Sequence, residues 1–175
     1  ESGQFARHPE WVDLKTVVDE AFDTMGEQAE EKDLKLTANY VGDCKVYSVA
    51  AEVEILLNNF ISNAVKYNRP SGSVTVDIKC LEHEVNIDVT DTGIGMTEDE
   101  SSRLFGEFVR IRNEKTRNIQ GSGLGLSIVK KIIRNLHGHI DVKSTPDIGS
   151  TFSIVIPKIE QEDALEQAGP LLARA

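Results

Sequence analysis

The feature that most constrains the fold of this chain is a run of alternate glycines leading into an apolar-periodic segment. Gly121, Gly123 and Gly125 are separated by single residues, and in residues 127–136 apolar side chains recur every three or four positions. This periodicity predicts a helix that packs one face on a core. Glycines let a backbone approach a ligand closely, and a helix start offers free N–H groups and a positive dipole end. The segment suits phosphate binding, and it equally suits a plain turn before a helix.

The glycine pattern differs from two common phosphate-binding motifs. Leu126 stands where the third glycine of a dinucleotide fingerprint belongs, and no strand-like run precedes the glycines. No Gly-Lys-Ser/Thr sequence follows them, which excludes a P-loop. A phosphate site here must therefore use another scheme, with groups supplied by other parts of the chain.

Length and composition indicate one globular domain. The 175 residues, of which 39% are hydrophobic, are enough to bury a core, and the net charge of -10 argues against a nucleic-acid partner. Cys44 and Cys80 are far apart in the sequence and lack metal-ligand spacing, so we interpret them as ordinary reduced thiols. Without a membrane-spanning run or a signal-peptide pattern, we expect a cytoplasmic location.

Hydrophobic periodicity predicts a mixed α and β structure. We expect a helix capped by Asp13, a second helix over residues 50–67 and a third after the glycine-rich turn. The first ten residues are expected to be irregular, and residues 97–120 have a poor hydrophobic pattern. Alternating apolar residues predict strands near residues 34–40, 46–47, 74–80, 85–89, 140–142 and 152–156.

The second predicted helix carries two asparagines and a lysine on one side. Asn59, Asn63 and Lys66 follow one another at four- and three-residue spacing, so they lie together beside the apolar stripe. Asparagine is unfavourable inside helices. The side chains are either a solvated helix edge or an amide pair that ligates Mg²⁺, with Lys66 reaching a phosphate. The spacing alone favours the solvated edge.

An acidic residue followed by two glycines closes one predicted strand. Asp91, Gly93 and Gly95 could form a tight turn. They could also hold a carboxylate that accepts a hydrogen bond from an exocyclic amine such as that of adenine, while the glycines admit a flat ring. Residues 103–117 then carry five basic and two acidic side chains, which is typical of a solvated face or of a lid over phosphates.

Taken together, these segments resemble the ATP-binding catalytic domain of sensor histidine kinases. That domain shares its fold with DNA gyrase B and the related chaperone and mismatch-repair ATPases. Each motif is weak alone, but the set is specific, and the resemblance covers residues 12–157. The matching N, G1, F and G2 boxes are Asn59-x-x-x-Asn63-Ala64-x-Lys66-Tyr67, Asp91-x-Gly93-x-Gly95, Phe105-x-x-Phe108 and Gly121-x-Gly123-x-Gly125.

The resemblance implies a role for each matching residue, with ATP and Mg²⁺ as cofactors. Asn63 is similar to the principal Mg²⁺ ligand and Asn59 to its assistant, and Lys66 and the lid residue Arg110 resemble the catalytic phosphate contacts. Asp91 is similar to the acceptor for the adenine amino group. The remaining implied ATP-binding residues are Tyr67 beside the adenine, Gly93, Ile94, Gly95, Gly121, Ser122, Gly123, Leu124, Gly125 and Thr151, the last in the adenine's water network.

One departure from the wider family bears on the reaction. Gyrase- and chaperone-type relatives have a glutamate that activates water one helical turn before the metal-binding asparagine. Here that position is Asn59, which cannot act as a general base. The resemblance therefore implies transfer of the γ-phosphate to a histidine on a helical dimerisation domain. The four histidines of the chain lack the family's acceptor context, namely His8, His83, His137 and His139.

The pattern and the resemblance predict the same architecture. We expect an α+β two-layer sandwich, in which three helices cover one face of a mixed, mostly antiparallel sheet of about five main strands. Residues 1–11 are expected to be the end of a linker from a dimerisation helix, residues 12–157 the ATP-binding domain, and residues 158–175 a tail without chemistry.

The expected partners are the dimerisation domain and the receiver domain of a response regulator. The fragment is expected to be a monomer and its parent a homodimer. Two other functions stay open. The chain could be a degenerate docking module that no longer depends on ATP, against which the four intact boxes argue. It could also be an ATP-gated clamp, against which Asn59 argues.

Overall fold

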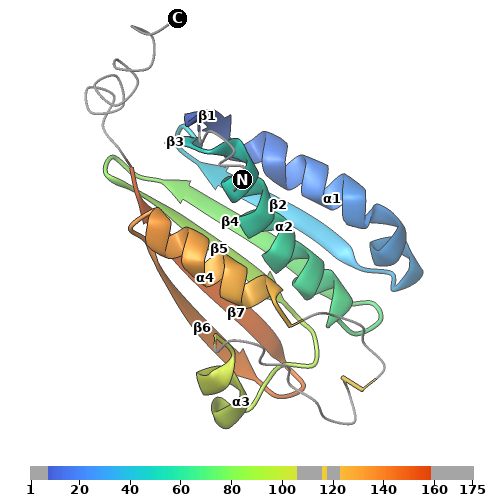
Figure 1. Cartoon of the computed structure of the whole chain (residues 1–175). Helices are drawn as coiled ribbons and strands as arrows, with labels where there is room; N and C mark the ends of the chain where they lie inside the picture. Colours follow the sequence, from blue (N-terminus) through green and yellow to red (C-terminus); the bar gives the residue numbers. More distant parts are fainter. Residues whose placement is uncertain (1–7, 106–115, 118–122, 159–175) are drawn as a thin grey trace, which may run out of the picture.

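The computed structural model describes residues 8–105, 116–117 and 123–158, and it has two layers (Figure 1). Helices α1 (Leu14–Glu31), α2 (Ala50–Lys66) and α4 (Gly125–Asn135) cover one face of the main sheet, with α2 in the middle. The strands of that sheet lie in the order β2 (Lys35–Val41), β4 (Ser73–Cys80), β5 (Glu84–Asp91), β7 (Gly149–Pro157) and β6 (His139–Thr145). The β2–β4 pair is parallel and the other pairs are antiparallel. The predicted α+β sandwich is confirmed.

The core lies between α2 and the inward faces of the central strands. Leu57, Phe60 and Ile61 of α2 are at most 1% exposed. The Phe60 ring packs on that of Phe152 in β7, with their centroids 5.2 Å apart. Each side chain buried in this way stabilises the fold by about 1.5–3 kcal/mol. This packing fixes the rotation of α2 and therefore the direction in which its polar edge faces.

Two elements differ from the sequence-based expectation. No strand is expected before the first helix, but β1 (Glu10–Asp13) begins at the last of the ten residues expected to be irregular and pairs with β3 (Lys45–Ser48) in a separate two-stranded sheet. A strand of four residues has no local signature, because it depends on its distant partner. Helix α3 (Glu98–Arg103) follows a capping box formed by Thr97 and Glu100, which is a signal that hydrophobic periodicity misses.

The start of α1 confirms one local prediction. Asp13 is the N-cap residue, and its carboxylate accepts a hydrogen bond of 3.0 Å from the backbone N–H of Lys15.

Among the described helices, none combines the length and apolarity that a membrane-spanning helix needs.

Candidate functional site

The two asparagines of α2 contact each other at the polar edge of the helix. Asn63 Nδ2 donates a hydrogen bond of 3.3 Å to Asn59 Oδ1. Within the described part of the chain, no hydrogen bond ends on Asn63 Oδ1. An amide oxygen left available in this way fits a hard cation such as Mg²⁺. Of the two amide oxygens, Asn63 Oδ1 is therefore the one that could hold such a cation, and Asn59 fixes the orientation of the Asn63 amide.

The beginning of α4 packs directly on this asparagine pair. A Cβ atom added to Gly125 would collide with the side-chain amide of Asn59, so only glycine fits there without displacing that amide. Two residues earlier, Gly123 has a φ of +73°, in the left-handed region that favours glycine. The glycine-rich turn and the polar edge of α2 thus meet. Gly121 and Ser122 lie outside the described residues.

The other end of the polar edge contacts the loop after β5. Tyr67 O accepts a hydrogen bond of 3.1 Å from the backbone N–H of Ile94. A Cβ atom at Gly93 would collide with the same carbonyl group, so this glycine allows the loop to approach α2. The Gly93 N–H in turn donates to Asp91 Oδ1 at 2.8 Å. The loop and the end of α2 are therefore one connected unit.

Asp91 is a buried carboxyl group at the end of β5. It is 8% exposed. Burial raises its pKa to about 6, while hydrogen bonds from the backbone N–H groups of Gly93 and Ser150 act in the opposite direction. At neutral pH the group is ionised and can only accept hydrogen bonds. This chemistry suits an exocyclic amino group in the site.

The sheet register separates Thr151 from Asp91. Thr151 pairs with Thr90, and their hydroxyl groups are 3.1 Å apart. Because side chains alternate along a strand, both hydroxyls lie on the face opposite to the carboxyl group of Asp91. Ser150 is the residue directly across from Asp91; it is 8% exposed and its hydroxyl lies 2.9 Å from that of Ser144. Sequence reasoning missed Ser150 because the sequence does not show which residue of β7 pairs with Asp91 of β5.

Four of the remaining predicted residues lie in the described part of the chain. Lys66 and Tyr67 are adjacent at the end of α2, and Lys66 Nζ lies 5.9 Å from the centroid of the Tyr67 ring. Gly95 has a φ of +61° and backs onto the carbonyl group of Thr145. Leu124 is the N-cap of α4 and is 39% exposed. Arg110 and Phe108 lie outside the described residues.

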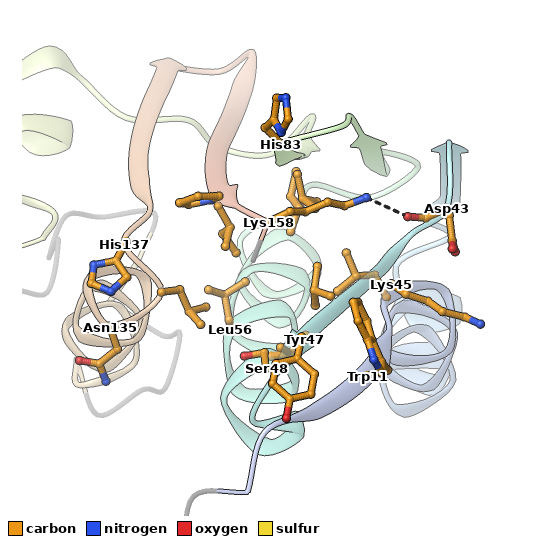
Figure 2. Close-up of a pocket in the computed structure, with 18 of the residues that line it drawn as sticks. Trp11, Asp43, Lys45, Tyr47, Ser48, Leu56, His83, Asn135, His137 and Lys158 are labelled. Carbon is orange, nitrogen blue, oxygen red and sulfur yellow. Dashed lines mark hydrogen bonds between the residues drawn. The ribbon is translucent and has the colours of Figure 1, made fainter. Parts of the chain in front are cut away.

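A cavity of about 1260 Å³ lies elsewhere in the molecule (Figure 2). Its lining comes from the β1–β3 pair, the first half of α2, β5 and the residues that end α4. Trp11, Tyr47 and Leu56 are among the lining residues, whereas none of the predicted nucleotide-contacting residues is. The volume is therefore separate from the connected polar unit, and we assign the candidate site to the latter.

Comparison with known proteins identifies the family. The family described as histidine kinase-, DNA gyrase B-, and HSP90-like ATPase matches residues 48–160, which is more than half of the chain. The chain belongs to this family. Its relatives include the sensor-like histidine kinase SenX3 of Mycobacterium tuberculosis, which is 32% identical over 148 residues, or 85% of this chain and 36% of SenX3.

A second relative is the autoinducer 2 sensor kinase/phosphatase LuxQ of Vibrio vulnificus. It is 39% identical over 134 residues, or 73% of this chain and 15% of LuxQ. The chain thus spans well under half the length of these relatives. Together with the family match, they make it the ATP-binding catalytic domain of the sensor histidine kinase type.

Solved structures show the same fold. The catalytic domain of histidine kinase ThkA superposes with a TM-score of 0.75 at 22% identity, covering 86% of this chain and 96% of that one. The mycobacterial sensor histidine kinase MprB superposes with a TM-score of 0.73 at 24% identity, covering 86% of this chain and 98% of that one. These likenesses extend over both layers of the sandwich.

Proposed function

We propose that this domain binds Mg-ATP at the polar unit between Gly125 and Asp91, and that its parent transfers the γ-phosphate to a histidine of a dimerisation domain. The observation that carries the proposal is the unbroken series of contacts through the predicted boxes. Gly125 packs on Asn59, which contacts Asn63, whose carbonyl group accepts the N–H of Tyr67. Tyr67 then contacts the loop that positions Asp91.

Each residue has a distinct task in this proposal. The ionised carboxylate of Asp91 accepts from the adenine amino group, with Ser150 rather than Thr151 beside it. Asn63 Oδ1, oriented by Asn59, would hold Mg²⁺, which would supply positive charge against the phosphates. Lys66 and Arg110 supply cationic phosphate contacts, and the N–H groups at the glycine-rich turn before α4 face phosphate oxygens.

The same residues favour transfer to an acceptor over hydrolysis. Asn59 occupies the position from which a general base would activate water, and an amide cannot take up that proton. The parent's partners in this proposal are its own dimerisation domain and a receiver domain. The structure of ThkA in complex with the response regulator protein TrrA supports the second partner by analogy. We place the protein in the cytoplasm and the bounds of its ATP-binding domain at residues 12–157.

The proposal is tested by calorimetric titration with ADP and a non-hydrolysable ATP analogue, with and without Mg²⁺. We expect the wild type to bind both nucleotides and Asp91→Asn to lose at least about 100-fold in affinity, because a buried acceptor is partly replaced by a donor. The control is Asp88→Asn, since Asp88 lies on the other face of β5 and pairs with Ser153. It should bind as the wild type does.

Two outcomes would contradict the proposal. Retained affinity in Asp91→Asn, with an unchanged circular dichroism spectrum, would remove the assignment of Asp91. Failure of the folded wild type to bind either nucleotide would favour the docking module, in which the boxes remain as architecture only.

A further inference from the structure

Lys32 reaches from the end of α1 to the end of α2. Its ammonium group donates hydrogen bonds to three backbone carbonyl groups, those of Val65 at 3.0 Å, Lys66 at 2.7 Å and Asn68 at 3.3 Å. A lysine ammonium carries three protons, so these contacts use its full donor capacity. Because all three donors bind backbone carbonyl groups, Lys32 holds the segment from Val65 to Asn68 in place.

These contacts complete the end of α2. The last four carbonyl groups of a helix have no partner within the helix, and they carry the negative end of its dipole. In α2 the first two of them, Asn63 O and Ala64 O, accept from Tyr67 N at 2.9 Å and Asn68 Nδ2 at 3.0 Å. Lys32 serves the other two, and it places a positive charge where the dipole favours one.

The turn that carries Lys32 is itself fixed. The carbonyl group of Lys32 accepts from Ser71 N at 2.8 Å, and the Ser71 hydroxyl donates to Asp33 Oδ2 at 2.9 Å. Lys35 N donates to Gly72 O at 3.0 Å. The segment from Lys32 to Lys35 is therefore bound to the turn that follows α2, and the ammonium group is directed at that turn by its own backbone.

The clamped residues include one predicted nucleotide contact, Lys66, and flank another, Tyr67. Lys32 binds the carbonyl groups of Lys66 and Asn68, and Tyr67 stands between them. Asn68 Oδ1 also accepts from the Thr92 hydroxyl at 3.4 Å, in the loop after Asp91. Displacement of this turn would move both the N box and the adenine loop.

We propose that Lys32 is a positioning residue of the nucleotide site, which acts by fixing the turn that presents Lys66 and Tyr67. This inference rests on the proposed function for the nucleotide and on the hydrogen bonds for the clamp. The loss of Lys32 should weaken nucleotide binding through Lys66, because the Lys32 ammonium group is engaged on backbone carbonyl groups and is not one of the proposed nucleotide contacts. Lys32 lies outside all four boxes of the family, so the box pattern does not point to it.

The test is a double-mutant cycle on the whole chain, read by titration with the ATP analogue and Mg²⁺. We expect Lys32→Met to weaken binding about tenfold in the wild-type background, but by about twofold or less in a Lys66→Ala background, because coupled residues are not additive. Lys35→Met removes an exposed lysine three residues away and should leave affinity unchanged. Lys32→Arg, which retains charge and donors, should recover part of the loss.

Four results would overturn the role of Lys32. An equal loss in both backgrounds would make Lys32 a general stabilising residue, and an unchanged affinity in Lys32→Met would remove its effect altogether. Amide hydrogen exchange tests the clamp without nucleotide. Lys32→Met should lose protection selectively at Asn68 and Ile94, and retained protection there overturns the clamp. Failure of the wild type to bind nucleotide overturns the proposed function, and with it the role of Lys32 towards that ligand.

Discussion

The two ends of α2 are built on different principles. At the C-terminal end each of the last four carbonyl groups accepts a hydrogen bond, from the backbone, from Asn68 or from Lys32. At the N-terminal end the cap residue Val49 provides no side-chain hydrogen bond, and the buried hydroxyl of neighbouring Ser48 has no partner within the described chain. Ser48 and Leu56 also line the cavity beside this end (Figure 2).

The difference shows where polar interactions are needed. The N-terminal half of α2 is held by apolar burial, which is strong but not directional. The C-terminal half presents amide and ammonium groups, which act on a ligand only if they are held in a defined geometry. Directional contacts are therefore concentrated at the end that carries the site. The predictions below test whether stability and binding are divided between the two ends in this way.

The largest expected effect on stability comes from the buried carboxyl group of Asp91. Its pKa is raised to about 6 in the folded protein, so between pH 4 and pH 6 the folded state binds more protons than the unfolded state. The free energy of unfolding should therefore fall as the pH rises through this window. Relative to Asp91→Asn, which cannot ionise, the wild type should lose about 2–3 kcal/mol between pH 4 and pH 7.

Urea unfolding of both proteins at several pH values measures this difference, and all other carboxyl groups cancel in the comparison. A more stable Asp91→Asn variant at pH 7 that no longer binds nucleotide would mean that the site end of the molecule gives up folding free energy for binding. Parallel pH profiles for the two proteins would show that burial does not raise the pKa of Asp91, which would contradict this prediction.

The contact between α4 and Asn59 is the next test. Gly125→Ala adds a methyl group that collides with the Asn59 amide, which should turn away and release Asn63. We expect about a tenfold loss of Mg²⁺-dependent affinity for the ATP analogue, or about 1.4 kcal/mol, with little change in stability because alanine favours a helix. Titration with and without Mg²⁺ separates the metal-dependent part.

Gly26→Ala is the matched control for that substitution. Gly26 lies within α1, and a Cβ atom there would meet nothing within 4 Å. The change should stabilise the fold by about 1 kcal/mol and leave nucleotide binding as it is. If Gly125→Ala bound as tightly as Gly26→Ala, the glycine-rich turn would not act on the asparagine pair.

Local sequence patterns were sufficient to predict much of this architecture. Alternation in β4 and β5 and the apolar stripe of α2 identify the core, and the same stripe places Asn59 and Asn63 at its edge. These features depend on neighbours within a few residues. The predicted roles of Asn59, Asn63, Lys66 and Asp91 came from the resemblance, since spacing alone favoured a solvated edge, and their chemistry stays a prediction.

Features that depend on distant partners were not predictable. The pairing of β1 with β3, the register that brings Ser150 to Asp91 and the reach of Lys32 to α2 each join segments more than 30 residues apart. Cys44 and Cys80 are another case, because burial and a hydrogen bond with Cys44 raise the pKa of the Cys80 thiol to about 12. Their separation in sequence gives no sign of this contact.

The smallest expected effect comes from the uncapped end of α2. Val49 already has the extended backbone of an N-cap residue, with φ of −72° and ψ of 114°, and Glu52 follows three residues later. Val49→Thr would add a hydroxyl of nearly the same shape and complete a capping box like the one at Thr97 and Glu100. Urea unfolding should show a gain of about 0.5–1 kcal/mol.

The same chemical change at an exposed strand position provides the control. Val41 in β2 is 57% exposed and starts no helix, so Val41→Thr should change stability by much less. Nucleotide affinity of Val49→Thr should equal that of the wild type, because the added hydrogen bond acts on the end of α2 that apolar packing already holds. A change in affinity from this substitution would mean that the two ends of α2 are coupled, so that stabilising the N-terminal end alters the geometry of the nucleotide site at the C-terminal end.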